Sequence, residues 1–220
     1  MTATRLLRAG SADDLAEAAR LLQAGRLVAF PTDTVYGLGT TTWNAAAVAR
    51  IFAAKERPPE KAIPVLVADL GGAGELMSHR PDGLVALAER YWPGPLTLVV
   101  PASNLLPVIV TAGTGTVALR APDHPAALAL LRRTGPLAVS SANRSGWDNP
   151  VTAADVLAQL GGRIDAVVDG GPCPGGLPST VFDLTQSPPG LLRRGPVDES
   201  EIRAVLAGAQ GDNFRIRVVN

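Results

Sequence analysis

RLVAFPTDTVYGLG, residues 26–39, joins a short apolar run to a polar segment that ends in glycine. The run 27–30 is typical of a buried strand, and Pro31 ends it because proline has no N–H to give to a sheet ladder. Short polar side chains follow at 32–36, and glycine lets a backbone approach a ligand closely. The stretch therefore predicts a strand that ends at a small polar ligand site. A turn whose Thr and Asp side chains only satisfy local backbone groups is the alternative.

Outward from this stretch, strand-like runs alternate with segments of helical periodicity. Helices are expected at 11–24, 45–55, 82–91, 124–135 and 198–208, with a further helix after a capping box formed by Thr152 and Asp155. Strands are expected at 26–30, 62–70, 95–101, 116–122 and 136–143, followed by three short ones within 165–171, 179–184 and 190–195.

This alternation predicts an α/β (α+β layered) domain with a twisted, mostly mixed β-sheet flanked by helices. The sheet is expected to be mixed because the last strands follow one another closely. We expect a single domain over 1–220, with a core of about 11–208 and a C-terminal tail at 209–220.

The composition narrows the class of protein. Hydrophobic residues make up 46% and charged residues 18%, which suits a folded domain. Twenty basic and twenty acidic residues give zero formal net charge, so the chain is no general nucleic-acid binder, although a local basic groove is compatible with it. With Cys173 alone, a disulfide within the chain is impossible. The sequence shows neither a leader pattern nor a run of 18 apolar residues, so we expect a soluble, cytoplasmic protein without membrane contact.

Several polar clusters share one pattern, in which hydrogen-bonding residues follow an apolar strand. They are 32–36, 140–146, Ser179–Thr180 and Arg193–Arg194. Because ligand sites of layered α/β domains gather at strand ends, these clusters are expected to converge on one cleft. No Walker loop, Rossmann fingerprint, metal-binding histidine pair or Ser–His–Asp arrangement accompanies them.

Two basic features complete the pattern. Lys55, Arg57 and Lys61 lie where a helix meets a proline-stiffened turn, which suits either a polyphosphate clamp or a solvated helix end. Arg120 ends an apolar strand and needs an anion if it is buried. That anion is either Asp33, Asp123 or another acid of this chain, or a substrate carboxylate.

In chain order, PTDTVYGLG, KERPPEK, ALRAPDHP, SSANRSG, PSTVFDL and LRRG resemble the motifs of YrdC-like L-threonylcarbamoyladenylate synthases. The resemblance extends from about residue 11 to 208 and is to the short, single-domain form. It implies a nucleotidyltransferase that condenses L-threonine, bicarbonate or CO2 and ATP into threonylcarbamoyl-AMP and pyrophosphate. A threonylcarbamoyl transferase complex would pass the product to tRNA, and direct tRNA contact is possible. The family fold has a concave basic cleft; Mg²⁺ would arrive with ATP, and no organic prosthetic group is implied.

The resemblance also implies roles for individual residues. Lys55 and Arg57 are expected to act in catalysis. The expected L-threonine-binding residues are Thr32, Thr34, Tyr36, Arg120, Ser140 and Ser179. The expected ATP-binding residues are Lys55, Arg57, Lys61, Ser141, Ala142, Asn143 and Arg193.

The chain also departs from the family pattern. Lys61-Ala62-Ile63 stands where many members have Lys-Pro-Leu, and Leu66 stands where some place a substrate-contacting histidine. Two other classes of protein remain open: a non-catalytic module binding tRNA or double-stranded RNA, and a carbamoyl-transfer domain of hydrogenase-maturation type. The former is disfavoured by zero net charge and few aromatics, and the latter by the lack of acylphosphatase and zinc-finger segments.

Overall fold

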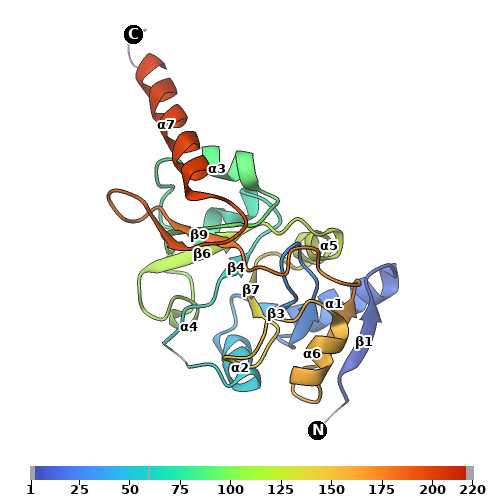
Figure 1. Ribbon diagram of the computed structural model, residues 1–220. Helices are drawn as coiled ribbons and strands as arrows, with labels where there is room; N and C mark the ends of the chain where they lie inside the picture. The colour runs from blue at the N-terminus through green and yellow to red at the C-terminus, as the bar shows by residue number, and fades with distance from the viewer. Residues whose placement is uncertain (1–2, 59, 217–220) are drawn as a thin grey trace.

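A computed structural model describes the backbone of residues 3–58 and 60–216 and the side chains of 3–58 and 60–209. One ten-stranded sheet runs through it, in the order β1-β8-β2-β3-β7-β4-β6-β5-β9-β10 (Figure 1). Its strands are β1 Arg5–Arg8, β2 Val28–Phe30, β3 Gly37–Thr41, β4 Val65–Leu66, β5 Leu96–Pro101, β6 Thr116–Arg120, β7 Leu137–Ser141, β8 Ala166–Asp169, β9 Thr180–Asp183 and β10 Gly190–Arg193. The helices are α1 Ala12–Gln23, α2 Ala45–Lys55, η1 Gly71–Leu76, α3 Leu84–Tyr91, α4 Val108–Thr111, α5 Pro125–Thr134, α6 Ala153–Leu160 and α7 Glu199–Ile216.

The sheet contains both parallel and antiparallel strand pairs, which confirms the prediction of a mixed sheet. β8 is parallel to both β1 and β2, whereas β3 is antiparallel to β2 and β7. On the other side of β7, β4 and β6 are parallel, β6 and β5 antiparallel, and β5 and β9 parallel.

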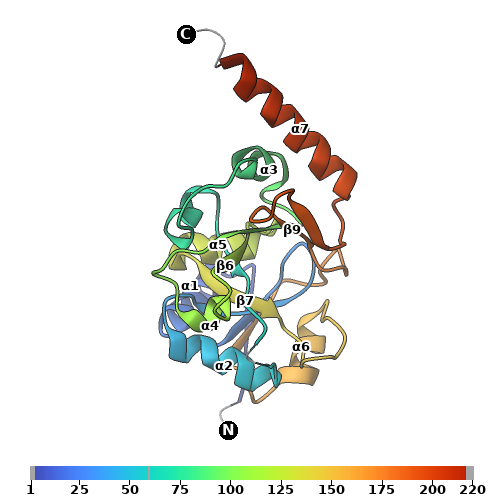
Figure 2. The same ribbon diagram turned by 90° about the vertical axis from the view of Figure 1, so that its left-hand side faces the viewer.

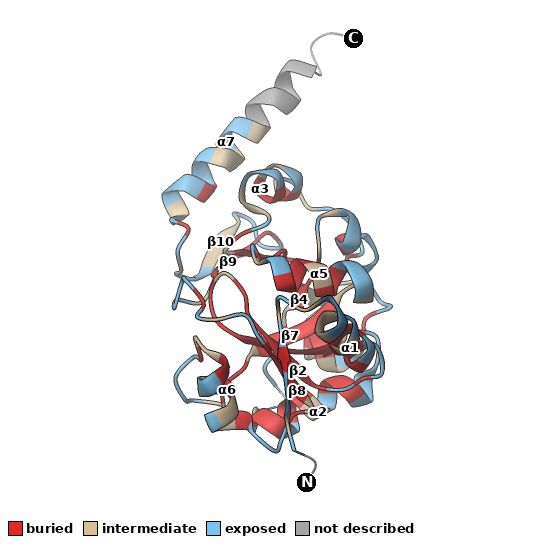
Figure 3. Ribbon diagram, turned by 90° about the vertical axis from the view of Figure 1, so that its right-hand side faces the viewer, coloured by how far each residue is buried: buried red, intermediate tan, exposed pale blue. Residues whose placement is uncertain are grey.

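The opening apolar run is buried on both faces. Val28 and Phe30 belong to one hydrophobic cluster, which also takes side chains from α1 and α5. Leu27 and Ala29 belong to a second cluster, which takes side chains from α2, α3, α6 and other elements. Because successive side chains of a strand point to opposite faces, this run separates two cores (Figure 3).

Side-chain caps start the helices where the sequence predicts them. Ser11, Asn44 and His124 accept hydrogen bonds from main-chain N–H groups of α1, α2 and α5. Thr152 and Asp155 form the expected capping box at α6. These interactions satisfy N–H groups that have no partner within the helix.

Some elements differ from the prediction. β3 was not expected, because Gly37 and Gly39 are poor strand formers. Gly37 is nonetheless required, because a Cβ there would lie 2.7 Å from Cγ1 of Val139 on β7. β1, beside β8 at the edge of the sheet, was also missed.

The predicted end of the last helix at 208 is wrong. The backbone of α7 is helical to Ile216, so most of the expected tail at 209–220 continues the helix. Residues 217–220 lie outside the described part of the chain. The helix extends away from the sheet and contacts the body near α3 (Figure 2). Within the described residues, no helix has the length and apolar character needed to cross a membrane.

Candidate functional site

Strand ends and the loops that follow them surround a cavity of about 240 Å³. Nine of the predicted site residues line it: Thr32, Thr34, Tyr36, Arg57, Arg120, Ser140, Ser141, Ser179 and Arg193. They come from segments distant in sequence, so the expected convergence of the polar clusters is confirmed. Lys55, Lys61, Ala142 and Asn143 are not among the lining residues.

A row of four neighbouring strands forms part of the cavity wall. On β6, Arg120 pairs with Leu66 of β4, and Thr97 of β5 pairs with Val181 of β9. The register between β5 and β6 places Leu98 opposite Leu119, so Thr97 and Arg120 face each other one step further along. All four residues line the cavity. Facing residues on adjacent strands project to the same side of a sheet, which explains why they share this wall.

The segment after β2 is held by threonine hydroxyls. Thr32 Oγ1 donates to the carbonyl of Val35 at 2.7 Å and accepts from the N–H groups of Thr34 and Val35. Its single proton is thereby used, so Thr34 is the donor in the 3.0 Å contact between the two hydroxyls. The turn interpretation of this stretch is therefore confirmed. Thr32 and Thr34 both also line the cavity, and their binding of a ligand stays a prediction.

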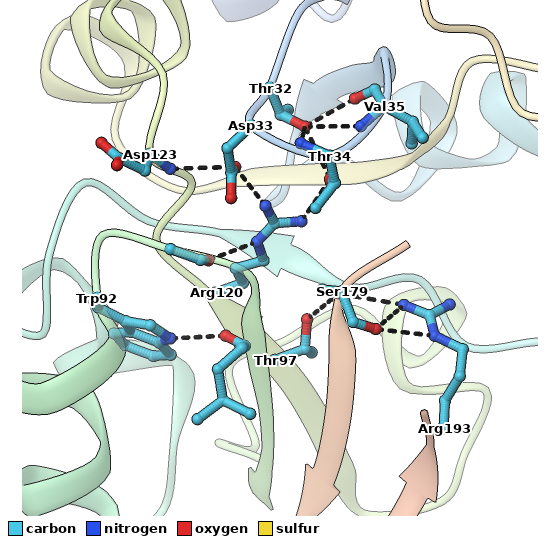
Figure 4. Close-up of polar contacts among 12 residues, drawn as sticks. Thr32, Asp33, Thr34, Val35, Trp92, Thr97, Arg120, Asp123, Ser179 and Arg193 are labelled. Carbon is cyan, nitrogen blue, oxygen red and sulfur yellow. Dashed lines mark hydrogen bonds and ion pairs between the residues drawn. The ribbon is translucent and has the colours of Figure 1, made fainter. Parts of the chain in front are cut away.

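Arg120 is buried and engaged from three directions (Figure 4). Nε donates to the carbonyl of Gly94, Nη1 to Thr34 Oγ1, both at 2.9 Å, and Nη2 forms an ion pair with Asp33. Structural pairing, one of the two alternatives for this residue, is thus observed. A guanidinium has five N–H donors, so two are left among the described contacts for a ligand carboxylate. Burial lowers the pKa of Arg120, and the neighbouring Asp33 opposes that shift.

At the β9–β10 end of the same row of strands, Arg193 holds Ser179. Its Nε and Nη2 donate to the Ser179 carbonyl at 3.0 and 2.8 Å, and Nη2 also lies 3.1 Å from Ser179 Oγ. Ser179 Oγ is 2.7 Å from Thr97 Oγ1. Thr97 is a cavity residue that the sequence analysis missed, although it is the sole polar residue in the apolar strand LTLVVP.

Lys55 lies behind the cavity and not in it. Its side chain is buried, and Nζ donates to the main-chain carbonyls of Ser141 and Asn143 and, at 3.4 Å, to Asn143 Oδ1. Burial, assisted by the charge of Arg57, lowers the pKa of Lys55 to about 7, whereas the oxygen acceptors favour the charged ammonium. In this arrangement Lys55 fixes the 141–143 turn, and its expected contact with ATP stays a prediction.

The remaining cations of the basic segment differ in exposure. Arg57 lines the cavity and donates through Nη2 to the carbonyl of Ala62 at 2.8 Å. Its buried Nε has no hydrogen-bond partner in the described part of the chain, and burial lowers the pKa of Arg57. Lys61 is exposed. Arg57 is thus the cation of this segment that lines the cavity, and its contact with ATP stays a prediction.

Tyr36 connects the 141–143 turn to the glycine-rich loop 170–176. Its carbonyl accepts the N–H of Ala142 at 2.8 Å, and its hydroxyl donates to the carbonyl of Gly171 at 2.7 Å. Burial raises the pKa of Tyr36 to about 12. The loop lies so close to the 32–36 segment that a Cβ on Gly175 would be 2.6 Å from the Asp33 carbonyl. Loop 170–176 is therefore part of the cavity's support.

The charge of the cavity is positive, as the resemblance implied. Its lining includes Arg57, Arg120 and Arg193 and, among the described residues, no carboxylate. In the same part of the chain, no group of three or more His, Cys, Asp and Glu residues could hold a metal ion. The arrangement suits a ligand with anionic groups.

Comparisons with a family model and with individual known proteins point to the same family. The family model Sua5_yciO_yrdC, described as "Telomere recombination", matches residues 20–195. The chain is 45% identical to threonylcarbamoyl-AMP synthase of Bacillus subtilis over 194 residues, 87% of this chain and 56% of that protein. It is 43% identical to a putative threonylcarbamoyl-AMP synthase of Mycobacterium tuberculosis, over 84% of this chain and 85% of that protein.

A solved structure agrees with this match. The crystal structure of Pyrococcus abyssi Sua5 complexed with L-threonine superposes with a TM-score of 0.89 at 41% identity, covering 93% of this chain and 61% of that chain. The chain thus spans somewhat more than half of the Bacillus and Pyrococcus proteins, and most of the mycobacterial one.

Proposed function

Because the chain belongs to the Sua5/YciO/YrdC family, we propose that it is a threonylcarbamoyl-AMP synthase. In this proposal the enzyme condenses L-threonine, bicarbonate or CO2 and ATP, and releases pyrophosphate. It is a nucleotidyltransferase, because an adenylyl group passes from ATP to the carbamate oxygen of threonylcarbamate.

The observation that supports this proposal most strongly is the composition of the cavity wall. Arg120 has unused donors for a carboxylate, and the hydroxyl groups of Thr34, Ser140 and Ser179 line the same cavity. A small amino acid with a polar side chain suits this half of the cavity. Arg57 and Arg193 lie in the same cavity and suit the phosphates of a nucleotide.

The proposed reaction has two steps. The neutral amine of threonine attacks CO2 and forms a carbamate, losing a proton. A carbamate oxygen then attacks the α-phosphorus of ATP, the bond to the bridging oxygen breaks, and pyrophosphate leaves. Neither step needs a covalent enzyme intermediate, so the protein acts by positioning the reactants and stabilising negative charge.

The cations have separate tasks in this mechanism. Arg57 is expected to offset charge on the phosphates, Lys61 to approach them from the exposed loop, and Lys55 to hold the 141–143 turn beside the nucleotide. Since the described residues offer no carboxylate cluster, Mg²⁺ is proposed to be held by the phosphate oxygens of ATP. The cytoplasmic location, the transferase complex as downstream partner and a contact with tRNA belong to the same proposal.

Pyrophosphate release tests the reaction class. We expect release to require L-threonine, bicarbonate and ATP together, and to stop when any one is omitted. Mass spectrometry should identify threonylcarbamoyl-AMP as the product. Release that continues without threonine would refute the proposal.

Arg57→Ala tests the phosphate-binding half of the site. Loss of one preorganised donor is expected to lower the rate by about 10²–10³-fold. Arg132→Ala removes an exposed arginine of α5 and serves as the matched control, with an unchanged rate. Full activity of Arg57→Ala would contradict the assignment.

A further inference from the structure

The cavity contains a hydroxyl pair to which neither the family resemblance nor the proposed mechanism assigns a role as a unit. Thr97 Oγ1 and Ser179 Oγ are 2.7 Å apart, on segments that lead into or lie on the parallel strands β5 and β9. Both residues line the cavity, and both are more than nine-tenths buried, with exposures of 3% and 4%. Figure 4 shows the side chains of Thr97 and Ser179 joined by this hydrogen bond.

A count of protons shows that the pair is incompletely satisfied. Each hydroxyl has one proton to donate, and Arg193 Nη2 donates to Ser179 Oγ. The bond between the hydroxyls uses one of the two protons. Among the described residues, the second proton has no acceptor. A buried donor without a partner costs free energy, so the pair favours a ligand that brings an acceptor oxygen.

The position of the pair indicates which part of a ligand it meets. Thr97 faces Arg120 across β5 and β6, as the register of these strands requires. Neighbouring strands are about 4.8 Å apart, so a small molecule whose carboxylate binds Arg120 also reaches Thr97. The ligand oxygen in question is therefore on the amino acid and not on a distant phosphate.

Resting on the proposed function, we propose that Thr97 is a further residue that binds and positions the amino-acid substrate, and that the Thr97–Ser179 pair presents one O–H donor to an oxygen of that substrate. When Thr97 donates to Ser179, Ser179 donates to the ligand, and the bond from Thr97 fixes the direction of that donor. When Ser179 donates to Thr97, Thr97 donates to the ligand. The substrate oxygen that accepts this hydrogen bond belongs either to the carboxylate of threonine or to its side-chain hydroxyl. Either group can accept from the O–H donor of the pair.

The test is direct calorimetric binding of L-threonine to the full chain. Thr97→Val keeps the shape of the side chain and removes the oxygen, so the dissociation constant should rise about 3- to 10-fold, the effect of one hydrogen bond. Thr97→Ser keeps the hydroxyl and should bind within about 2-fold of the unmodified protein. Thermal unfolding checks that each variant is folded, and Thr97→Ala replaces Thr97→Val if the latter does not fold.

A second ligand identifies the oxygen. L-2-Aminobutyrate lacks the side-chain hydroxyl of threonine and keeps its carboxylate. If the pair binds the side-chain hydroxyl, Thr97→Val should bind this analogue as the unmodified protein does. If the pair binds the carboxylate, the 3- to 10-fold loss should persist with both ligands.

Other outcomes overturn the inference. Equal threonine affinity of Thr97→Val and the unmodified protein would show that the hydroxyl contributes nothing, and equally weak binding by Thr97→Ser would assign the loss to packing. If either result is found while the unmodified protein still binds threonine and releases pyrophosphate, the role of Thr97 is refuted and the proposed function stands. Absence of threonine binding in the unmodified protein would refute the proposed function as well.

Discussion

Replacing Asp33 by alanine tests whether the 32–36 segment and the strand wall form one unit. Asp33 Oδ1 pairs with Arg120 Nη2 and also accepts the N–H of Asp123 at 3.1 Å. The side chains of Asp33 and Arg120 are only 13% and 7% exposed, so solvent screens the pair weakly. Asp33→Ala would leave the guanidinium of Arg120 buried without its counter-charge.

The expected magnitude follows from this burial. Breaking a buried ion pair by removing one partner costs about 3–5 kcal/mol. For a chain of this length, 1 kcal/mol corresponds to about 2–4 °C in melting temperature, so Asp33→Ala should lower the melting temperature by roughly 6–20 °C. Asp33→Asn keeps an oxygen acceptor and loses the charge, and should lower the free energy of unfolding by about 1–2 kcal/mol.

Urea unfolding followed by circular dichroism measures these free energies. The control is Glu199→Ala, which breaks the exposed pair with Arg203 on α7 and should cost about 1 kcal/mol or less. Calorimetry of the Asp33→Asn protein should also show weaker L-threonine binding, because the guanidinium loses an anchor. A loss below 1 kcal/mol in Asp33→Ala, or equal losses in Asp33→Ala and the Glu199→Ala control, would refute this account of the pair.

Three further changes test the supports of the cavity. Lys55→Met removes the donor to two main-chain carbonyls of the 141–143 turn; urea unfolding should show a loss of about 2–3 kcal/mol, and an unchanged midpoint would contradict the anchoring role. Tyr36 has an ordinary pKa of 10.0 that burial raises to about 12, so the folded protein keeps a proton that the unfolded chain releases. The resulting stability is present below pH 10 and lost as the pH rises to about 12; Tyr36→Phe should remove this decline from pH-dependent unfolding curves. Gly175→Ala would place a Cβ 2.6 Å from the Asp33 carbonyl and should lower both the melting temperature and threonine affinity, whereas Gly10→Ala, with no atom within 4 Å, should change neither.

The sequence predicted the helices well because their signals are local. Ser11, Asn44 and Thr152 mark helix starts through contacts only two or three residues long, and the structure has those contacts. Glycine-rich β3 carries no such signal. Gly37 is in a strand because Val139 packs against its backbone, and this contact depends on a residue about a hundred positions away.

The same contrast applies to the site. Polar clusters at strand ends could be recognised one by one, and their convergence followed from the layered fold. Thr97 could not be recognised, because its place in the cavity depends on the register of β5 against β6 and β9. The placement of Lys55 behind the cavity could not be predicted either, since a lysine at a helix end is usually solvated.

The cavity also has a consequence for how the chain acquires its binding capacity. Its lining residues run from Thr32 to Arg193, so about 160 residues separate the first from the last. At a synthesis rate of about 5–20 residues per second, Thr32 is added to the chain roughly 8–30 s before Arg193. Contacts so distant in sequence form late in folding, because the long loops between them must close first. A nascent chain that ends before Ser179 already has Arg120 on β6 but lacks this serine, and should not retain threonine.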